Sequence, residues 1–185
     1  MRPALLFTTL LALSTPSSAR EARFTLSSPD IAARSSIAPT FVFNSFGCTG
    51  QNLSPALEWS GIPTAAKSLA LIVHDPDAKT GVGGFTHWLV YNLPLNTTGL
   101  ERGAGGPGGA GLPRDAAQSA TSFGTPGWGG PCPPAGEKAH RYVFTLYALG
   151  VERLELPQNA SQAFVGFNIV GNALAKTSFT ALYGR

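Results

Sequence analysis

Two histidines and two carboxylates are spaced so that the folded chain could bring them together. Asp75 and Asp77 form an Asp-Pro-Asp turn directly after an apolar run, and His87 follows ten residues after Asp77. A second histidine, His140, opens another apolar stretch just after the glycine- and proline-rich segment 130–136. Imidazole can donate hydrogen bonds to phosphate or carboxylate oxygens. The pattern favours a small polar pocket that binds an anion.

The same residues also have structural interpretations. An Asp before proline favours a turn, and its side chain can accept hydrogen bonds from nearby backbone N–H groups. Two carboxylates would repel an anion, so we expect at least one of Asp75 and Asp77 to orient the histidines rather than contact the ligand. His74 lies on the opposite strand face from Asp75 and is expected to be structural.

Catalytic and metal-binding sites have less support. Two histidines and two carboxylates would suffice as metal ligands, but no His-x-x-x-His spacing accompanies them. A hydrolase that uses His87 and Asp75 on a bound water rests on residue types alone, and the chain lacks a Gly-x-Ser-x-Gly elbow. We therefore expect no metal, no cofactor and no catalytic residues.

Three apolar segments are expected to be the strands that position these groups. Residues 68–74 form a nearly continuous apolar run whose length suits a strand buried on both faces. Residues 87–93 and 141–149 are the other two. Alternation along the last segment places His140 and Tyr142 on one face, so both could line the same cavity.

The remaining segments are less regular. A short strand is expected from Leu57, and a long surface loop over residues 95–130, where glycines are frequent. Phe164, Phe167 and Val170 have helical spacing within the segment 158–176, and a last strand is expected at 178–183.

Composition limits the class of protein. The chain has 185 residues, of which 43% are hydrophobic and 12% charged, which suits one globular domain with a core. Its 22 glycines and 15 prolines favour turns and short strands over long helices. The net charge of +3 includes no cluster of Lys and Arg, so binding to nucleic acid is not expected.

The N-terminus has the pattern of a secretory signal peptide. Arg2 precedes an apolar run over residues 4–13, and small residues follow up to Ala19. The alternative is a retained anchor, but the run is shorter than the about 20 apolar residues of a membrane span. We expect a signal peptide at 1–19 and one exported domain at 20–185, in the periplasm or secreted.

Export changes the interpretation of the two cysteines, Cys48 and Cys132. In an oxidising compartment a pair of cysteines favours a disulfide, and the alternative is two buried thiols. A bridge that closes so long a loop would stabilise the fold by about 4 kcal/mol.

Several ordered motifs resemble one family over roughly residues 24–184. They are Gly47-Cys48-x-Gly50-x-Asn52-x-Ser54-Pro55, Asp75-Pro76-Asp77-Ala78, His87-Trp88-Leu89-Val90-Tyr91-Asn92-Leu93-Pro94, Gly130-Pro131-Cys132-Pro133-Pro134-x-Gly136, His140-Arg141-Tyr142-x-Phe144 and Val165-Gly166-Phe167-Asn168. The chain thereby resembles the phosphatidylethanolamine-binding proteins, or Raf kinase inhibitor-like proteins, and most closely their bacterial and archaeal branch.

The resemblance implies a mainly β (α+β) fold with a large central antiparallel sheet, a smaller sheet and peripheral helices. It also makes a bridge between the two cysteine-bearing loops plausible. Two positions depart from the family pattern: Lys79 replaces a proline after the Asp-Pro-Asp-Ala turn, and Trp128 stands where animal members carry a tyrosine. By motif position, the implied pocket residues are Asp75, Asp77, His87, Trp128, Cys132, Pro133, His140 and Tyr142.

The function expected from the resemblance is non-catalytic binding of phosphate-type anions or phospholipid headgroups by an exported protein, with peripheral membrane contact as one consequence. The alternative is a surface-mediated inhibitor of a protease or another exported partner, in which the pocket is regulatory. A third alternative is the hydrolase that uses His87 and Asp75.

Overall fold

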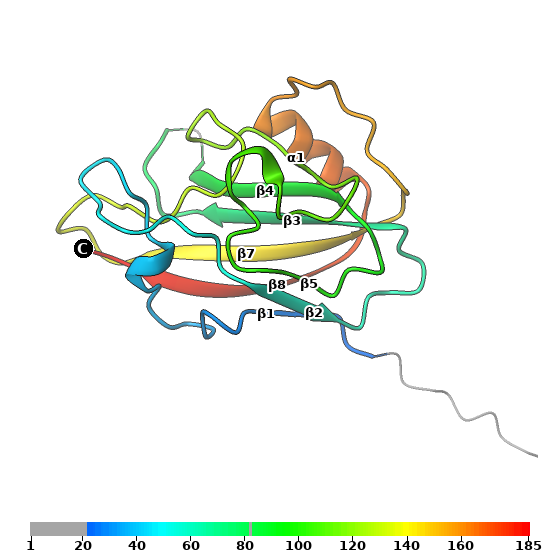
Figure 1. The fold of residues 1–185 in the computed structure, drawn as a ribbon, viewed down its shortest axis with the longest axis horizontal. Coiled ribbons are helices and arrows are strands. Elements are labelled where there is room, and N and C mark those ends of the chain that lie inside the picture. Colours follow the sequence, from blue (N-terminus) through cyan, green and yellow to red (C-terminus); the bar gives the residue numbers. More distant parts are fainter. Residues whose placement is uncertain (1–21, 82) are drawn as a thin grey trace, which may run out of the picture.

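Two antiparallel sheets dominate the computed structural model, which describes residues 22–81 and 83–185 (Figure 1). The larger sheet has five strands in the order β6-β4-β3-β7-β8, and the smaller has three in the order β1-β2-β5. One helix, α1 (Gln162–Gly171), and the 3-10 turns η1 (Pro39–Phe41) and η2 (Pro107–Gly109) lie outside the sheets. The predicted mainly β architecture is confirmed. The strands are β1 (Thr25–Ser27), β2 (Leu57–Ser60), β3 (Ser68–Asp75), β4 (Phe85–Leu93), β5 (Gly99–Leu100), β6 (Ala117–Gln118), β7 (His140–Leu149) and β8 (Ala173–Tyr183).

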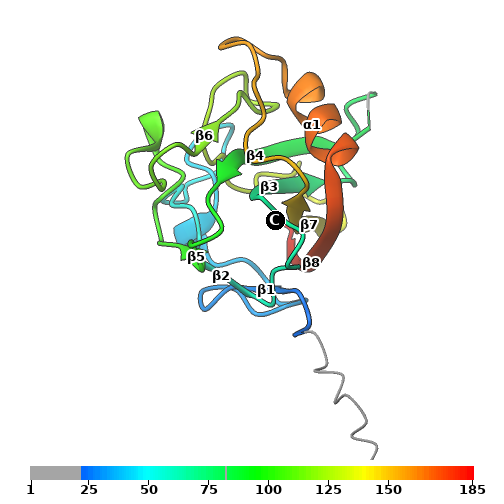
Figure 2. The same cartoon turned by 90° about the vertical axis from the view of Figure 1, so that its right-hand side faces the viewer.

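The central strand β3 is buried on both faces, as its apolar run predicted. Leu69, Leu71 and Val73 point into the main core, on the side of the small sheet. Ala70 belongs to a second cluster with Val165 and Ile169 of α1. The large sheet is therefore covered by the helix on one face and by the small sheet and loops on the other, as Figure 2 shows.

A β-bulge in β4 determines where His87 points. Val73 of β3 pairs with Trp88, and the next residue, His74, pairs with Thr86. His87 is therefore an extra residue without a partner on β3. A bulge breaks the strict alternation of side chains and re-aims the extra one. As a result His87 lies on the same side of the sheet as Tyr142, with the two ring centroids 5.1 Å apart.

The segment 95–130 corrects the expectation of a surface loop. It contains the strands β5 and β6, and it buries Leu100, Ala104 and Trp128 in the main core. The chain approaches closely at Gly105, where an added Cβ would lie 2.9 Å from the Trp88 ring. These buried side chains are part of the main core, together with Leu69, Leu71 and Val73 of β3.

The C-terminal boundaries also differ from expectation. The helix is present, with Ser161 as its N-cap, but it ends at Gly171, and β8 already begins at Ala173. Phe167 and Val170, whose spacing indicated the helix, point outward and are exposed. The extended pairing of β8 with β7, which continues to Ala173, outweighs the helical pattern at 172–176.

The predicted signal peptide, residues 1–19, lies outside the described residues. Within residues 22–81 and 83–185, no helix is long and apolar enough to cross a membrane.

Candidate functional site

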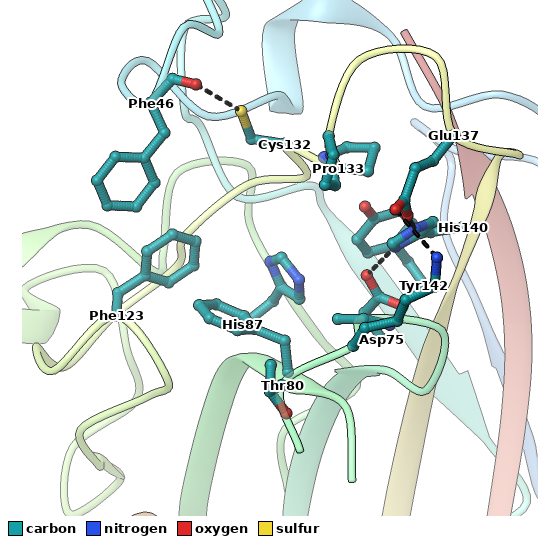
Figure 3. Close-up of a pocket in the computed structure, with 14 residues that line it drawn as sticks. Phe46, Asp75, Thr80, His87, Phe123, Cys132, Pro133, Glu137, His140 and Tyr142 are labelled. Carbon is teal, nitrogen blue, oxygen red and sulfur yellow. Dashed lines mark hydrogen bonds and ion pairs between the residues drawn. The ribbon is translucent and has the colours of Figure 1, made fainter. Parts of the chain in front are cut away.

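The ends of three neighbouring strands surround a cavity of about 270 Å³. Asp75 is the last residue of β3, whereas Phe85 and His140 are the first residues of β4 and β7. Because β3 runs antiparallel to both neighbours, its C-terminal end meets their N-terminal ends at one edge of the sheet. His87 and Tyr142 lie slightly deeper in the same cavity (Figure 3).

Asp75 is buried, and both oxygens of its carboxylate have partners. Oδ1 accepts hydrogen bonds from the backbone N–H groups of Asp77 at 2.8 Å and Ala78 at 3.1 Å. Oδ2 lies 2.7 Å from Nδ1 of His140. Asp75 therefore closes the turn and orients the histidine.

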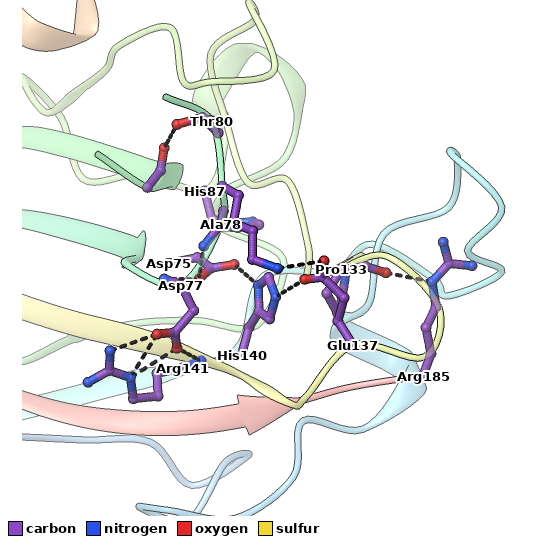
Figure 4. Close-up of polar contacts among 12 residues, drawn as sticks. Asp75, Asp77, Ala78, Thr80, His87, Pro133, Glu137, His140, Arg141 and Arg185 are labelled. Carbon is purple, nitrogen blue, oxygen red and sulfur yellow. Dashed lines mark hydrogen bonds and ion pairs between the residues drawn. The ribbon is translucent and has the colours of Figure 1, made fainter. Parts of the chain in front are cut away.

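His140 lies between two carboxylates (Figure 4). Its Nδ1 faces Asp75, and its Nε2 lies 3.1 Å from Oε2 of Glu137. Burial opposes the charged form, but the hydrogen bonds to the two carboxylates outweigh it and raise the pKa of His140 above its ordinary value. The raised pKa favours an imidazolium that donates from both nitrogens.

His87 is in the opposite state. Burial lowers the pKa of His87 to about 4, so the ring is neutral near pH 7. Its Nδ1 lies 2.6 Å from the carbonyl oxygen of Gly129 and must donate to it, because a carbonyl can only accept. Nε2 then carries the lone pair, and it has no hydrogen-bond partner among the described residues. This geometry makes Nε2 of His87 an acceptor rather than the expected donor.

Tyr142 contributes a hydroxyl with no partner. The side chain is fully buried, and its Oη makes no hydrogen bond within residues 22–81 and 83–185. Burial and the nearby charge of Asp75 raise the pKa of Tyr142, so the phenol keeps its proton. The Asp75 carboxylate lies close enough to the hydroxyl to contribute to this shift.

Two of the residues implied by the motifs lie outside this cavity. Asp77 faces away from it and accepts hydrogen bonds from the backbone N–H and the guanidinium of Arg141, at 2.8 and 2.7 Å. These bonds lower the pKa of Asp77 to about 2. Trp128 is buried in the core beneath, and its indole N–H donates to the carbonyl oxygen of Phe41 at 3.2 Å.

The predicted disulfide is present and joins Cys48 to Cys132 across 84 positions of sequence. Cys132 and Pro133 both line the cavity, so the bridge holds one wall against the loop that carries Cys48. Arg185 ties the same loops by donating to the carbonyl oxygens of Pro133 and Gly47, at 2.7 and 2.9 Å. The Cys132 sulfur lies 3.7 Å from the carbonyl oxygen of Phe46, a contact without a proton because the sulfur is oxidised.

Sequence reasoning missed an aromatic wall and a charged rim. Phe46 and Phe123 come from separate loops and, with Phe85, form an apolar side of the cavity. Glu137 and Lys79 lie at the rim, joined by an ion pair of 3.1 Å. Of these residues, the sequence singles out Lys79 alone, by its place in a motif. Phe46, Phe123 and Glu137 lie in loops far apart in sequence, which carry no periodic signal. The described residues contain no cluster of three or more potential metal ligands.

Comparison with known proteins places this geometry in context. The family model described as phosphatidylethanolamine-binding protein matches residues 27–184. The chain is similar to the UPF0098 protein YbcL of Escherichia coli, with 42% identity over 179 residues, 97% of each chain. The crystal structure of YbcL, titled a new member of the mammalian PEBP family, superposes with a TM-score of 0.85 at 41% identity, covering 89% of this chain and 99% of that one.

A second relative is named as a lipoprotein. The putative lipoprotein LppC of Mycobacterium tuberculosis is 42% identical over 116 residues, which cover 63% of this chain and 52% of LppC. In this chain, the disulfide is of the kind that forms in oxidising compartments outside the cytoplasm.

Proposed function

The chain belongs to the phosphatidylethanolamine-binding protein family, and from that premise we propose that it is an exported, non-catalytic protein that binds a phosphate-type anion or a phospholipid headgroup. The proposed site is the cavity bounded by Asp75, His87 and His140. The observation that carries the proposal is the hydroxyl of Tyr142, which is buried, protonated and without a partner. A buried donor without an acceptor costs about 1–3 kcal/mol, which a ligand oxygen in the cavity would offset.

The other polar groups of the cavity support the same ligand class. Nε2 of His87 offers an acceptor, and the imidazolium of His140 offers a charged donor once its Nε2 is released from Glu137. A phosphate group that still carries a proton, or one attached to an ammonium group, can satisfy both, because it accepts and donates. The apolar wall of Phe46, Phe85 and Phe123 suits the carbon part of such a ligand.

Among the described residues that line the cavity, no side chain is an activated nucleophile, which supports a non-catalytic role. Both cysteines are held in the disulfide, and the hydroxyl of Thr80 donates to the carbonyl oxygen of Gly84 at 2.8 Å. The phenol of Tyr142 stays protonated because its pKa is raised. None of these groups is hydrogen-bonded to His87 or His140, the pairing that activates a nucleophile.

The test is an NMR titration of the mature protein with inorganic phosphate and with phosphoethanolamine. We expect shifts at His87, His140 and Tyr142. A Tyr142→Phe variant should keep its stability, because its hydroxyl has no partner to lose, yet bind about two- to tenfold more weakly. An absence of shifts in the wild-type protein up to millimolar concentrations of both ligands would refute the proposal.

A further inference from the structure

Glu137 occupies the position that an anion would need. Nδ1 of His140 is hydrogen-bonded to Asp75, so Nε2 is the ring nitrogen that could bind a ligand. Oε2 of Glu137 lies 3.1 Å from that Nε2. Glu137 itself lines the cavity and lies directly beside His140 in Figures 3 and 4. A carboxylate of the chain thus makes the contact that a ligand phosphate would make.

Lys79 holds this carboxylate in place. Its Nζ lies 3.1 Å from Oε1 of Glu137, the oxygen that does not face His140. The hydrogen bonds from Lys79 and His140 lower the pKa of Glu137, so the side chain is ionised near neutral pH. The charges therefore alternate along Asp75, His140, Glu137 and Lys79, so each of these two cations has a carboxylate partner.

The contact is built to open. The Lys79 side chain is 80% exposed and the Glu137 side chain 32% exposed, so water can solvate both after they separate. Exposed ion pairs of this kind contribute little to stability, because water screens the two charges. The backbone around Gly136, whose φ is +81°, has open space beside it, with no atom within 4 Å of an added Cβ. The backbone N–H of Gly136 donates to the carbonyl oxygen of Arg185 at 2.8 Å, whereas the carboxylate of Glu137 is held over His140 by its two polar contacts.

We propose that Glu137 is an internal competitor for the anion site, held over His140 by Lys79, and that a ligand binds by exchanging its own anionic group for this carboxylate. The inference rests on the proposed function, because it assigns a specificity role within the same cavity. An anion can bind Nε2 of His140 only by displacing the Glu137 carboxylate. Only anions that bind this nitrogen more strongly than Glu137 does would therefore occupy the site. The displaced carboxylate and Lys79 remain at the rim.

The opposite role for Glu137 would be a direct contact with the ligand. The ammonium group of a phosphoethanolamine headgroup could pair with Glu137 while the phosphate binds elsewhere in the cavity. The two roles predict opposite effects when the charge is removed. Removal of a competitor tightens binding, whereas removal of a partner weakens it.

The experiment measures the dissociation constants of inorganic phosphate and of phosphoethanolamine by calorimetry for the wild type and Glu137→Gln. Glutamine keeps the shape and removes the charge. The matched control is Glu155→Gln, because Glu155 is 83% exposed, pairs only with Arg153 and lies outside the cavity. We expect Glu137→Gln to bind phosphate about fivefold more tightly than the wild type, and Glu155→Gln to match the wild type.

The outcomes separate this inference from the proposed function. Phosphate binding by Glu137→Gln that is tighter than in both other proteins, or that appears only in this variant, supports the competitor. If phosphate binds equally more tightly to Glu137→Gln and Glu155→Gln, the effect comes from net charge alone, and the competitor role of Glu137 is overturned. Weaker binding of phosphoethanolamine by Glu137→Gln would also overturn it, and would make Glu137 an ammonium partner. If no protein binds either ligand, the proposed function fails, and the competitor with it.

Discussion

The neutral, buried His87 should make the protein lose stability in mild acid. The perturbation is a change of pH from 7 to 4. In the unfolded chain an imidazole takes up a proton near its ordinary pKa of about 6.5. In the folded protein, burial lowers the pKa of His87 to about 4, so the ring resists protonation over this range. Its Nδ1–H is already committed to Gly129, which fixes the neutral form.

The sign and size follow from the difference between the two pKa values. Because the folded-state pKa is depressed, the unfolded state binds more protons between pH 6.5 and pH 4, and stability falls as the pH falls. Each pKa unit corresponds to about 1.4 kcal/mol. With a folded pKa of about 4, the loss amounts to about 3 kcal/mol by pH 4. The raised pKa of His140 acts in the opposite direction, because its contribution is complete below pH 6.5 and is lost at higher pH.

The assay is urea unfolding at several pH values for the wild type and for His87→Gln. The amide of glutamine can still donate to Gly129, but it does not titrate. The contribution of His140 is common to both proteins and cancels in the difference. We expect the wild type to lose about 3 kcal/mol relative to the variant between pH 7 and pH 4. A difference that does not change with pH would refute the reasoning.

An NMR titration of the His87 ring gives an independent reading if the variant folds poorly. The imidazole resonances of the wild-type protein should stay in the neutral form down to about pH 5 and titrate with a pKa of about 4. A midpoint near 6.5 would show that burial does not exclude the charge, and the predicted loss of stability would fail with it.

Three further variants test the contacts that support the cavity. Asp75→Asn should lower the stability by about 2–4 kcal/mol and lower the pKa of His140. The carboxylate uses one oxygen for the turn N–H groups and the other for His140, whereas an amide has a single acceptor oxygen. Asp77→Asn is its control and should cost less, since that carboxylate pairs with an arginine at the surface. Replacement of Cys48 and Cys132 together by alanine should lower the stability by about 2–5 kcal/mol in urea unfolding, and an unchanged midpoint would show that the loops need no bridge.

The frame of the cavity could be predicted from local patterns. The apolar run of β3 indicated a strand buried on both faces, and alternation along β7 placed His140 and Tyr142 on one face; both predictions are confirmed. These properties depend on neighbouring residues alone. The direction of His87 depends on a bulge, and period-two alternation from Trp88 would have placed it on the opposite face. The bulge is visible only in the pairing with β3.

The walls of the cavity could not be predicted in the same way. Phe46 and Phe123 are 77 positions apart in sequence and approach because two loops fold over one sheet edge. Trp128 matches a motif position, but its indole N–H donates to the carbonyl oxygen of Phe41 inside the core. Motif spacing identifies which residues share a neighbourhood. It does not say whether a side chain faces the cavity or the protein interior, since that depends on packing from the other elements.

The electrostatic conflict between two carboxylates and an anion has a structural answer. Asp77 is neutralised by Arg141 outside the cavity, and Asp75 is committed to its own turn and to His140. Asp77 therefore does not face a ligand, and the charge of Asp75 is paired with His140, which weakens the repulsion that the sequence suggests. The groups that remain uncommitted are neutral, namely the hydroxyl of Tyr142 and Nε2 of His87. Recognition in such a site would depend on the direction of hydrogen bonds more than on net charge, because opposed charges already cancel in pairs around it.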